Sequence, residues 1–354
     1  MHLFVDISSH GFGHLALSAP VLNALWRRSR ESGRDFCLTL RSGLALEKLR
    51  SRIDAPFAHV AGSSDFGFVM IDALRIDLAA SGAAYRRAHE DWAGRVAREA
   101  QFLAGLGIHG VFSNVSYLPL AGAAAASIPA LALCSLNWAD LFAHYFGGES
   151  WSADIHGQIL AAYRSARLFL RPAPAMPMDS IGRRASVGPI AVLGRRHALP
   201  LAARRSVLVA LGGFDHRLPL ENWPETPDIR WLVPAAWECQ HPQALSFESL
   251  GLDFTDLLAS VDAVLTKPGY GIVAEAACNG TPVLYQRRED WPEQDCLIDW
   301  LQTFGRAREV AGARLQSGDL VHDLEALLAL PAPPPILPTG AEEAAEIIEQ
   351  LFGA

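Results

Sequence analysis

Two glycine-rich turns, one in each half of the chain, constrain its fold more than any other feature. The first, S-H-G-F-G-H at residues 9–14, follows an apolar run at residues 3–7. The second, K-P-G-Y-G at residues 267–271, follows the apolar residues 263–265. Each pattern predicts a buried strand, a tight turn and the start of a helix. Because a helix start offers unpaired N–H groups and the positive end of the helix dipole, each turn suits a phosphate or another anion.

The rest of the chain repeats this alternation of short apolar runs and helical patterns. Further strands are predicted at residues 36–40, 110–112, 130–134, 206–211 and 282–285. Helices are predicted at residues 15–26, 118–126, 158–166, 254–258 and 271–279, the last one ending at Gly280. Such alternation predicts an α/β fold with parallel, doubly wound sheets. A chain of 354 residues is long enough for two such domains.

Proline-rich segments indicate where the domains begin and end. Residues 171–177 break regular structure, and we expect the linker near residues 190–205. The first domain is therefore predicted at 1–195 and the second at 205–330. Residues 331–338 predict a rigid connector. After it, Thr339 and Glu342 form a capping-box pattern ahead of a terminal helix, 339–354, that can cross back to the first domain.

Composition excludes several classes of protein. The formal net charge is −8, which argues against a general nucleic-acid binder. Arginine clusters at 27–30, 195–196 and 204–205 predict solvated faces, or weak peripheral attraction to an anionic membrane. No apolar run is long enough for a transmembrane segment, and residues 1–7 read as a strand rather than a signal peptide. Five scattered cysteines without metal-binding spacing predict buried free thiols in a cytoplasmic protein.

His10 and His14 flank the glycines of the first turn. A histidine has a pKa near neutrality, which suits it to remove a proton from a hydroxyl group. Two histidines in one glycine turn after a buried strand therefore indicate a catalytic role. The alternative is that their side chains bond backbone carbonyls and shape the turn.

The second turn carries groups suited to a nucleotide. Gly269 and Gly271, with Tyr270 between them, let a ligand approach the backbone. Lys267 can offset phosphate charge. Glu275, one turn into the helix, can accept the hydroxyls of a ribose, or it can serve only as a partner of the helix dipole.

Two further segments complete the predicted ligand-binding residues. Gly212, Gly213 and Phe214 follow a predicted strand and form either a nest for a diphosphate or an ordinary tight turn. The polar loop after residue 285 carries Glu293 and Gln294, which can read sugar hydroxyls, or it is a solvated surface.

These motifs resemble the GT-B glycosyltransferases, which include the N-acetylglucosaminyltransferase of lipid II synthesis and the plant UDP-sugar glycosyltransferases. The resemblance rests on H-G-F-G-H at 10–14, G-G-F at 212–214, and K-P-G-Y-G-I-V-A-E-A followed by G-T-P-V at 267–283. More narrowly, the chain resembles the glycosyltransferase-like N-terminal region of plant L-arabinokinases. That likeness extends to Asp65-Phe66-Gly67, to Asp72-Ala73-Leu74 with Asp77, to Asn137-Trp138 with Asp140, and to R-R-E-D at 287–290. It covers most of the chain and implies two Rossmann-like domains facing a cleft.

The resemblance implies roles for individual residues. His14 matches the histidine base, with Gly13 beside the donor, and Glu275 matches the glutamate that binds ribose. The turn at 269–271 matches the site beneath the donor phosphates, and Lys267 stands where plant transferases have a phosphate-contacting histidine. Glu293 and Gln294 lie near the donor-sugar pair, out of strict register with it.

One position departs from the family pattern. Where the plant transferases have an aspartate that activates the histidine, this chain has Asn114. An amide can orient an imidazole, but it does not stabilise the imidazolium as a carboxylate does. Either Asp6, Asp65 or Asp140 takes over that charge, or the base is weakened, or the chain binds a sugar nucleotide without transferring it.

The sequence thus predicts a glycosyltransferase of the hexosyltransferase type that needs neither metal nor cofactor. It would move a sugar from a nucleotide sugar, with UDP implied by the resemblance, to a hydroxyl of a small molecule, a glycan or a lipid. Two alternatives stay open. One is a non-catalytic sugar-nucleotide-binding or interaction module, and the other is a sugar-nucleotide 2-epimerase, which would require further acid and base carboxylates near the sugar.

Overall fold

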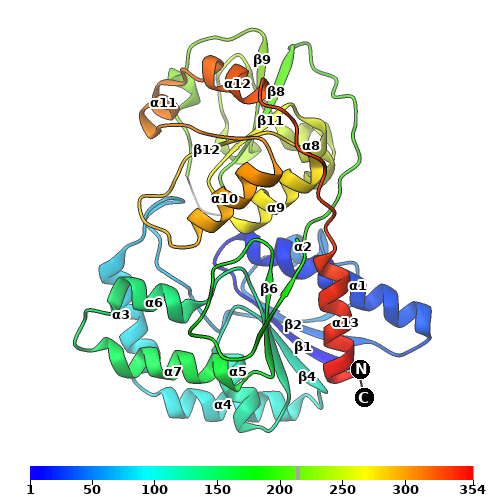
Figure 1. Cartoon of the computed structure of the whole chain (residues 1–354), viewed down its shortest axis with the longest axis vertical. Coiled ribbons are helices and arrows are strands. Elements are labelled where there is room, and N and C mark those ends of the chain that lie inside the picture. The colour runs from blue at the N-terminus through cyan, green and yellow to red at the C-terminus, as the bar shows by residue number, and fades with distance from the viewer. Residues whose placement is uncertain (213–215, 354) are drawn as a thin grey trace. The chain divides into compact units, whose positions relative to one another are not determined.

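The computed structural model describes residues 1–212 and 216–353, and the chain divides into two compact units (Figure 1). Unit 1 comprises Met1–Met70, Ile76–Ile190 and Thr339–Ala354. Unit 2 comprises Ile71–Arg75 and Ala191–Pro338. Each unit contains one parallel sheet with flanking helices, so the predicted α/β class with two doubly wound sheets is confirmed.

Unit 1 is built on a seven-stranded sheet in the order β3-β2-β1-β4-β5-β6-β7. Its strands are β1 (His2–Ile7), β2 (Cys37–Ser42), β3 (Ala58–Ala61), β4 (Gly110–Asn114), β5 (Ala130–Leu133), β6 (Leu168–Pro172) and β7 (Arg184–Val187). Its helices are α1 (Phe12–Ser32), α2 (Leu46–Arg50), α3 (Leu78–His89), α4 (Trp92–Gly105), α5 (Leu118–Ala125), α6 (Trp138–Phe146), α7 (Ser152–Ser165) and α13 (Gly340–Phe352). The central strands β1 and β4 are buried along almost their whole length, which explains their apolar sequences.

Unit 2 is built on a six-stranded sheet in the order β10-β9-β8-β11-β12-β13. Its strands are β8 (Arg205–Ala210), β9 (Ile229–Val233), β10 (Ala244–Ser246), β11 (Ala263–Thr266), β12 (Val283–Tyr285) and β13 (Ala307–Glu309). Its α-helices are α8 (Phe254–Ser260), α9 (Tyr270–Asn279), α10 (Gln294–Phe304), α11 (Gly312–Ser317) and α12 (Val321–Leu328), and 3₁₀ turns occupy Leu220–Asn222, Ala235–Trp237 and Phe247–Leu250. Trp223 and Trp231 meet edge to face in its core, with ring centroids 4.9 Å apart.

The terminal helix α13 belongs to unit 1, where it lies beside α1 (Figure 1). Arg28 of α1 donates two hydrogen bonds to the Glu349 carboxylate, at 3.0 and 2.8 Å. The predicted capping box at its start is wrong. Thr339 already has helical dihedral angles and makes no side-chain cap, and the Glu342 carboxylate pairs with Arg27 instead. The helix start is held by close backbone packing, since a Cβ on Gly340 would meet the Gly188 carbonyl oxygen.

Two smaller expectations are also corrected. Residues 171–172 do not break regular structure, because they end strand β6, which pairs with both β5 and β7. Pro172 is tolerated there because it is the last residue of the strand. The cysteines are free but not uniformly buried: Cys134 and Cys278 are buried, whereas Cys37 is exposed at the first position of β2.

A buried ion cluster joins the sheet of unit 1 to its helices. Arg41 of β2 donates to Asp6 of β1 at 2.5 Å and binds Glu99 of α4 through two hydrogen bonds, at 2.9 and 2.6 Å. All three side chains are at least 88% buried, so water cannot replace a lost partner. Such a cluster specifies how α4 lies on the sheet.

We expect Arg41→Met to destabilise unit 1 by about 3–5 kcal/mol, because it leaves two carboxylates buried without their cation. The free energy of unfolding from urea denaturation measures this loss. Arg98→Met is the matched control, since Arg98 pairs with Asp91 where both side chains are mostly exposed. An equal loss of unfolding free energy in the two variants would show that the buried cluster stabilises unit 1 no more than an exposed ion pair does.

Candidate functional site

The topology of each sheet marks one edge where a ligand can bind. In unit 1 the strand order reverses direction between the neighbours β1 and β4, and in unit 2 between β8 and β11. At such a switch point the loops leave the carboxyl ends of the two strands toward opposite sides, which opens a crevice in open α/β sheets. The residues after these four strands are those on which the sequence motifs converge.

In unit 1 the switch point brings His14 to Asn114. Asn114 ends β4, and its Oδ1 lies 3.0 Å from His14 Nδ1. The amide nitrogen donates to the His14 carbonyl oxygen at 3.2 Å and to Ser18 Oγ at 2.7 Å. A carbonyl oxygen can only accept, so the amide nitrogen must face it and the amide oxygen must face the imidazole. The neutral His14 ring therefore carries its proton on Nδ1 and its lone pair on Nε2, as a general base requires.

The same geometry explains why this position holds an amide and not the aspartate of the plant transferases. An aspartate would replace the amide nitrogen by an oxygen, and this oxygen would face the His14 carbonyl oxygen at hydrogen-bond distance. Two acceptors at that distance repel each other. Ser18, one turn after His14, completes the arrangement, and sequence reasoning missed it because a serine inside a helix gives no distinct signal.

His10 lies at the opposite end of the same turn and packs against Trp138. The two rings meet edge to face with centroids 5.3 Å apart, and the His14 ring also faces Trp138, at 6.0 Å. Gly11, between the two histidines, has φ +97° and is the residue from which α1 begins, with Gly13 in its first turn. Trp138 thus forms a common wall for both imidazoles.

The three carboxylates that could replace the missing charge have other partners. Asp6 pairs with Arg41, and Asp140 accepts from Asn137 Nδ2 at 2.8 Å. Asp65 accepts from Ser8 Oγ at 2.9 Å and from Trp138 Nε1 at 2.6 Å. His14 Nδ1 lies 3.0 Å from the oxygen of the Asn114 amide and 3.8 Å from the Cys134 thiol sulfur.

In unit 2 the switch point brings Lys267 between the two glycine turns. A Cβ on Gly212, which has φ +93°, would lie 3.5 Å from Lys267 Nζ, and one on Gly269 would lie 3.9 Å from it. The ammonium group is therefore next to the backbone of both turns. Gly213 and Phe214, predicted beside them, lie outside the described residues.

Lys267 has an unusual electrostatic environment for a lysine. Burial lowers its pKa well below the ordinary 10.5, the nearby Arg288 lowers it further, and Glu293 opposes the shift. The chain contains only two lysines, Lys48 and Lys267. A buried cation beside a second cation favours an anion as ligand, because the anion would stabilise both charges.

Helix α9 carries the remaining donor-binding predictions. It begins after Gly269 and contains Tyr270 and Gly271 in its first turn and Glu275 in its second. Gly280, with φ +71°, ends the helix as predicted. The Glu275 side chain is buried, so its proposed contact with ribose requires that it line the ligand-binding surface of unit 2. That role stays a prediction.

The loop after β12 is ordered by its own side chains. Gln294 Oε1 accepts from the Arg288 backbone N–H at 2.9 Å, and its Nε2 donates to the Arg288 carbonyl at 3.2 Å. The Arg288 guanidinium lies 4.2 Å from the centroid of the Trp291 ring, and Trp291 Nε1 donates to Glu293 at 3.0 Å. Gln294 thus clamps the loop, and Glu293 orients Trp291, whereas their predicted contacts with a donor sugar remain untested. Sequence reasoning missed the Arg288–Trp291 pair, which an arginine three residues before a tryptophan in one loop could have suggested.

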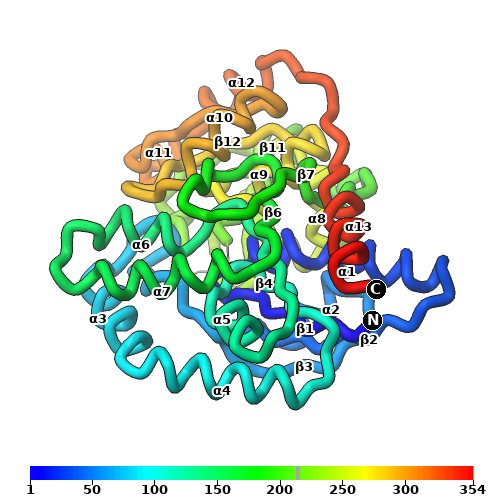
Figure 2. The backbone as a smooth tube through the Cα atoms, turned by 60° about the horizontal axis from the view of Figure 1, so that its bottom comes forward, coloured from blue at the N-terminus to red at the C-terminus, as the bar shows by residue number. Residues whose placement is uncertain are grey.

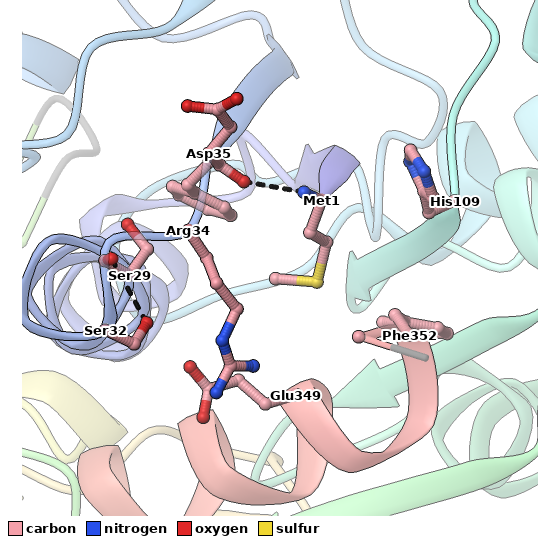
Figure 3. A pocket seen from close by; sticks show the side chains of 10 residues that line it. Met1, Ser29, Ser32, Arg34, Asp35, His109, Glu349 and Phe352 are labelled. Atoms are coloured by element: carbon pink, nitrogen blue, oxygen red, sulfur yellow. Dashed lines mark hydrogen bonds between the residues drawn. The ribbon is translucent and has the colours of Figure 1, made fainter.

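Unit 1 also has a hollow at the opposite edge of its sheet from His14 and Asn114 (Figure 3). It has a volume of about 120 Å³ and lies where Met1, Phe36 and His109 precede the amino ends of β1, β2 and β4. The last turn of α13 closes it, so the first and last described residues lie close together (Figure 2). His14 and Asn114 lie at the opposite, carboxyl ends of β1 and β4, so this hollow is not part of the candidate site.

No helix among the described residues combines the length and the apolar character that crossing a bilayer requires. No group of three or more histidine, cysteine, aspartate or glutamate side chains among them is placed to hold a metal ion.

Comparison with known proteins supports the fold. No protein-family model matches the chain. A protein of Arabidopsis thaliana described as L-arabinokinase is 24% identical over 340 residues, which cover 92% of this chain and 32% of that protein. The chain therefore spans about a third of the length of this curated relative. This similarity is consistent with the resemblance found in the sequence motifs.

Solved structures share the architecture over almost the whole chain. The calicheamicin glycosyltransferase CalG4 matches with a TM-score of 0.62 at 16% identity, covering 99% of this chain and 94% of that one. A UDP-N-acetylglucosamine 2-epimerase matches with a TM-score of 0.57 at 13% identity, covering 100% and 97%. The chain thus has the GT-B fold with two Rossmann-like domains, as expected. At these identities the likeness shows the fold alone, and transferases and an epimerase share it.

The Asn114 geometry leads to a stability prediction. We expect Asn114→Asp to destabilise unit 1 by about 1–3 kcal/mol, because the new oxygen faces the His14 carbonyl and Ser18 loses a donor. Ionising the new carboxyl is disfavoured in the folded state, so its folded pKa lies above its unfolded value of about 3.9. The loss of unfolding free energy in Asn114→Asp should therefore be smallest in acid. It should grow as pH rises from the unfolded pKa toward the higher folded pKa.

Urea midpoints of Asn114→Asp and of the unmodified protein, compared from about pH 4 to pH 7, check this prediction. Asn23→Asp is the matched control, because Asn23 Nδ2 also donates to a carbonyl, that of Arg52 at 3.0 Å, but water reaches that site. A deficit that is independent of pH, or equal to that of the control, would contradict the assigned orientation of the Asn114 amide.

Replacing Lys267 is expected to stabilise the ligand-free protein, in contrast to Asn114→Asp. The folded pKa of Lys267 is lowered, so between that pKa and 10.5 the unfolded chain binds more protons, and stability falls as pH drops through this window. We expect Lys267→Met to unfold at higher temperature than the unmodified protein at pH 7 without ligand. The difference should shrink toward pH 10. Lysine-selective NMR measures the pKa directly, since Lys48 is the only other lysine signal and serves as the internal reference. A pKa near 10.5 for both lysines would contradict the lowered pKa of Lys267.

Proposed function

We propose that this protein transfers a sugar from a nucleotide sugar to a hydroxyl group of an acceptor, with His14 as the general base. The observation that carries the proposal is the pair of bonds made by the Asn114 amide, which fixes the lone pair of the neutral His14 ring on Nε2. A histidine held in this tautomer after a buried strand is prepared to accept a proton. The GT-B fold supports the reaction class without establishing it.

The donor is proposed to bind unit 2. The diphosphate would lie against the N–H groups at Gly212 and at the start of α9, with Lys267 beside both turns. Glu275 would accept the ribose hydroxyls, and Glu293 and Gln294 would border the sugar. The proposal of uracil as the base rests on the sequence resemblance alone. No metal or cofactor is required in this scheme, because Lys267 and the dipole of α9 supply positive charge to the departing diphosphate.

The proposed chemistry is a single displacement at the sugar. His14 Nε2 takes the proton of the acceptor hydroxyl, and the acceptor oxygen forms a bond to the anomeric carbon. The bond between that carbon and the diphosphate oxygen breaks, and the nucleoside diphosphate leaves with the electron pair. The Asn114 amide keeps the ring oriented throughout, but as a neutral group it stabilises the resulting imidazolium less than a carboxylate would.

Two other functions remain candidates on specific observations. The neutral partner of His14 favours a protein that binds sugar nucleotides without turning them over. The likeness to a 2-epimerase at a TM-score of 0.57 keeps epimerisation as a third candidate. Product analysis separates the three: a transferred sugar, an epimerised nucleotide sugar, or binding without any product.

A screen of nucleoside diphosphates and their sugar conjugates by thermal shift tests the proposal, followed by turnover of the donor that binds. A ligand at 100 times its Kd stabilises the folded protein by about 2.7 kcal/mol. We expect Glu275→Gln to weaken nucleotide binding by about 1–3 kcal/mol, because hydrogen bonds to a charged acceptor are lost. We expect His14→Gln to keep the thermal shift and to lower turnover by about 10²–10⁴.

His109→Gln is the control for the second variant, because His109 lies at the amino ends of the strands. Its turnover should equal that of the unmodified protein. Full turnover in His14→Gln would remove His14 as the base. Failure of every nucleotide to stabilise the protein would remove the donor site in unit 2.

A further inference from the structure

One carboxylate near the candidate site has no role in the proposed reaction. Asp65 follows β3, and its carboxylate accepts hydrogen bonds from Ser8 Oγ at 2.9 Å and from Trp138 Nε1 at 2.6 Å. The Ser116 side chain also acts on this carboxylate. Ser8 follows β1, and Trp138 is the first residue of α6. The residue as a whole is partly exposed, but its carboxyl group is enclosed by protein. A single side chain therefore ties the β3 loop to two other elements of unit 1.

Both donors to Asp65 also touch the turn that carries the histidines. Ser8 Oγ accepts a hydrogen bond from the His10 backbone N–H, at 3.3 Å. The Trp138 ring packs edge to face against the rings of His10 and His14. Short charge-assisted hydrogen bonds are stronger than neutral ones, so the carboxylate restrains the indole that forms this wall.

The loop of Asp65 makes one further contact with the turn. Gly67 has φ +59°, and a Cβ on it would lie 2.7 Å from His10 Cδ2 and 2.9 Å from Trp138 Cη2. Tyr85 of α3 donates to the Gly67 carbonyl at 2.9 Å and fixes the loop from its other side. The glycine is required here, because any side chain would displace His10 or the indole. The D-F-G segment at 65–67 thus acts as one unit that holds the histidine turn.

The charge state of Asp65 changes within a physiological range of pH. Burial raises the pKa of its carboxyl to about 6, the charge of Asp6 raises it as well, and the hydrogen bonds from Trp138 and Ser8 oppose the shift. The hydroxyls of Tyr85, Tyr117 and Tyr163 also interact with it, and the rings of His10 and His14 are the titratable groups on the other side of the Trp138 indole. Burial raises the pKa of each of these tyrosines, so all three are neutral near pH 6, and Asp6 is already paired with Arg41.

We propose that Asp65 is a positioning residue for the histidine turn: its carboxylate holds the Trp138 indole and Ser8, and through them it sets where the imidazoles of His10 and His14 lie. Protonation converts one acceptor oxygen into a hydroxyl and weakens both bonds, which loosens the wall. The effect on catalysis rests on the proposed function, whereas the effect on Trp138 does not. Asp65 carries a negative charge, which the neutral Asn114 lacks. It does not touch His14 directly but binds Trp138, whose ring packs against the His14 ring.

The first test follows the indole N–H of Trp138 by NMR between about pH 5 and pH 8. The protein has nine tryptophans, and Trp138→Phe identifies the signal. We expect the signal to move with a midpoint near pH 6 and to become independent of pH in Asp65→Asn. A Trp138 signal that does not titrate in the unmodified protein would overturn the proposal, and this result requires no variant of Asp65 to fold. A titration that persists in Asp65→Asn would assign the effect to the histidines and would also overturn it.

The second test separates kcat from KM for donor turnover. Asp65→Asn should lower kcat at least tenfold at pH 7 while the KM for the donor and the thermal shift by the nucleotide stay within twofold, because the donor is proposed to bind unit 2. Asp140→Asn is the matched control, since it changes a carboxylate that lies in α6 and whose partners are Asn137 and Ser180. An unchanged kcat in Asp65→Asn, or an equal loss in the control, would overturn the positioning role.

The two proposals fail in different ways. If the unmodified protein turns over no donor, the proposed function fails, and the NMR titration still decides the role of Asp65. If Asp65→Asn does not fold, Ser8→Ala removes the hydrogen bond that Asp65 accepts from Ser8, and it should lower kcat less than tenfold. A kcat equal to that of the unmodified protein in Ser8→Ala would remove Ser8 from the chain of contacts.

Discussion

The candidate site depends above all on the three hydrogen bonds of the Asn114 amide. They join the end of β4 to the first turns of α1, and they determine which nitrogen of His14 bears the proton. The Asn114 carbonyl adds a fourth link, because it accepts from the Ser8 backbone N–H at 2.7 Å. One residue therefore fixes the imidazole, the helix start and the end of β1. An aspartate would supply charge to the imidazole, but it could not donate to the His14 carbonyl. The Asn114 amide therefore orients the imidazole without supplying charge, and the Asp65 carboxyl, whose pKa burial raises to about 6, binds Trp138 and not the imidazole.

Parallel sheets explain how such a site can be assembled from distant parts of the sequence. His14 and Asn114 are 100 residues apart, and they meet because β1 and β4 are neighbours whose carboxyl ends lie at the same edge. Gly212 and Lys267 meet for the same reason at β8 and β11. In each unit the loop after the first of these strands contains a glycine with positive φ, Gly11 or Gly212, which lets the backbone turn sharply at the edge of the sheet. The chemistry of each unit thus follows from its strand order.

Much of this architecture was accessible from the sequence, and the failures have physical causes. The strands β1 and β11 are buried on both faces, so their apolar runs predict them clearly, whereas β4 gave a weaker and shorter signal at residues 110–112. Gly280 ends α9 in the αL conformation, which glycine adopts readily. Strand β7 escaped prediction because it is the edge strand of its sheet, half exposed and mixed in sequence. The capping box at Thr339 failed because tertiary contacts, the ion pair of Glu342 with Arg27, overrode a local pattern. Pairing of His14 with Asn114 could be anticipated from the family pattern, whereas Ser18, Trp138 and the Gln294 clamp depend on side-chain geometry that no local pattern encodes.

The choice of lysine at position 267 connects stability with the proposed function. The chain has 30 basic side chains besides histidine, and only two of them are lysines. An arginine at this position would keep its charge in the ligand-free protein, buried beside Arg288, because a guanidinium does not lose its proton. A lysine with a strongly lowered pKa can instead be neutral while the site is empty. A diphosphate would favour the charged form, so under the proposed function binding takes up a proton at Lys267 and the positive charge appears together with the anion that it serves. The cost of burying a cation is then confined to the liganded state, in which the anion offsets it.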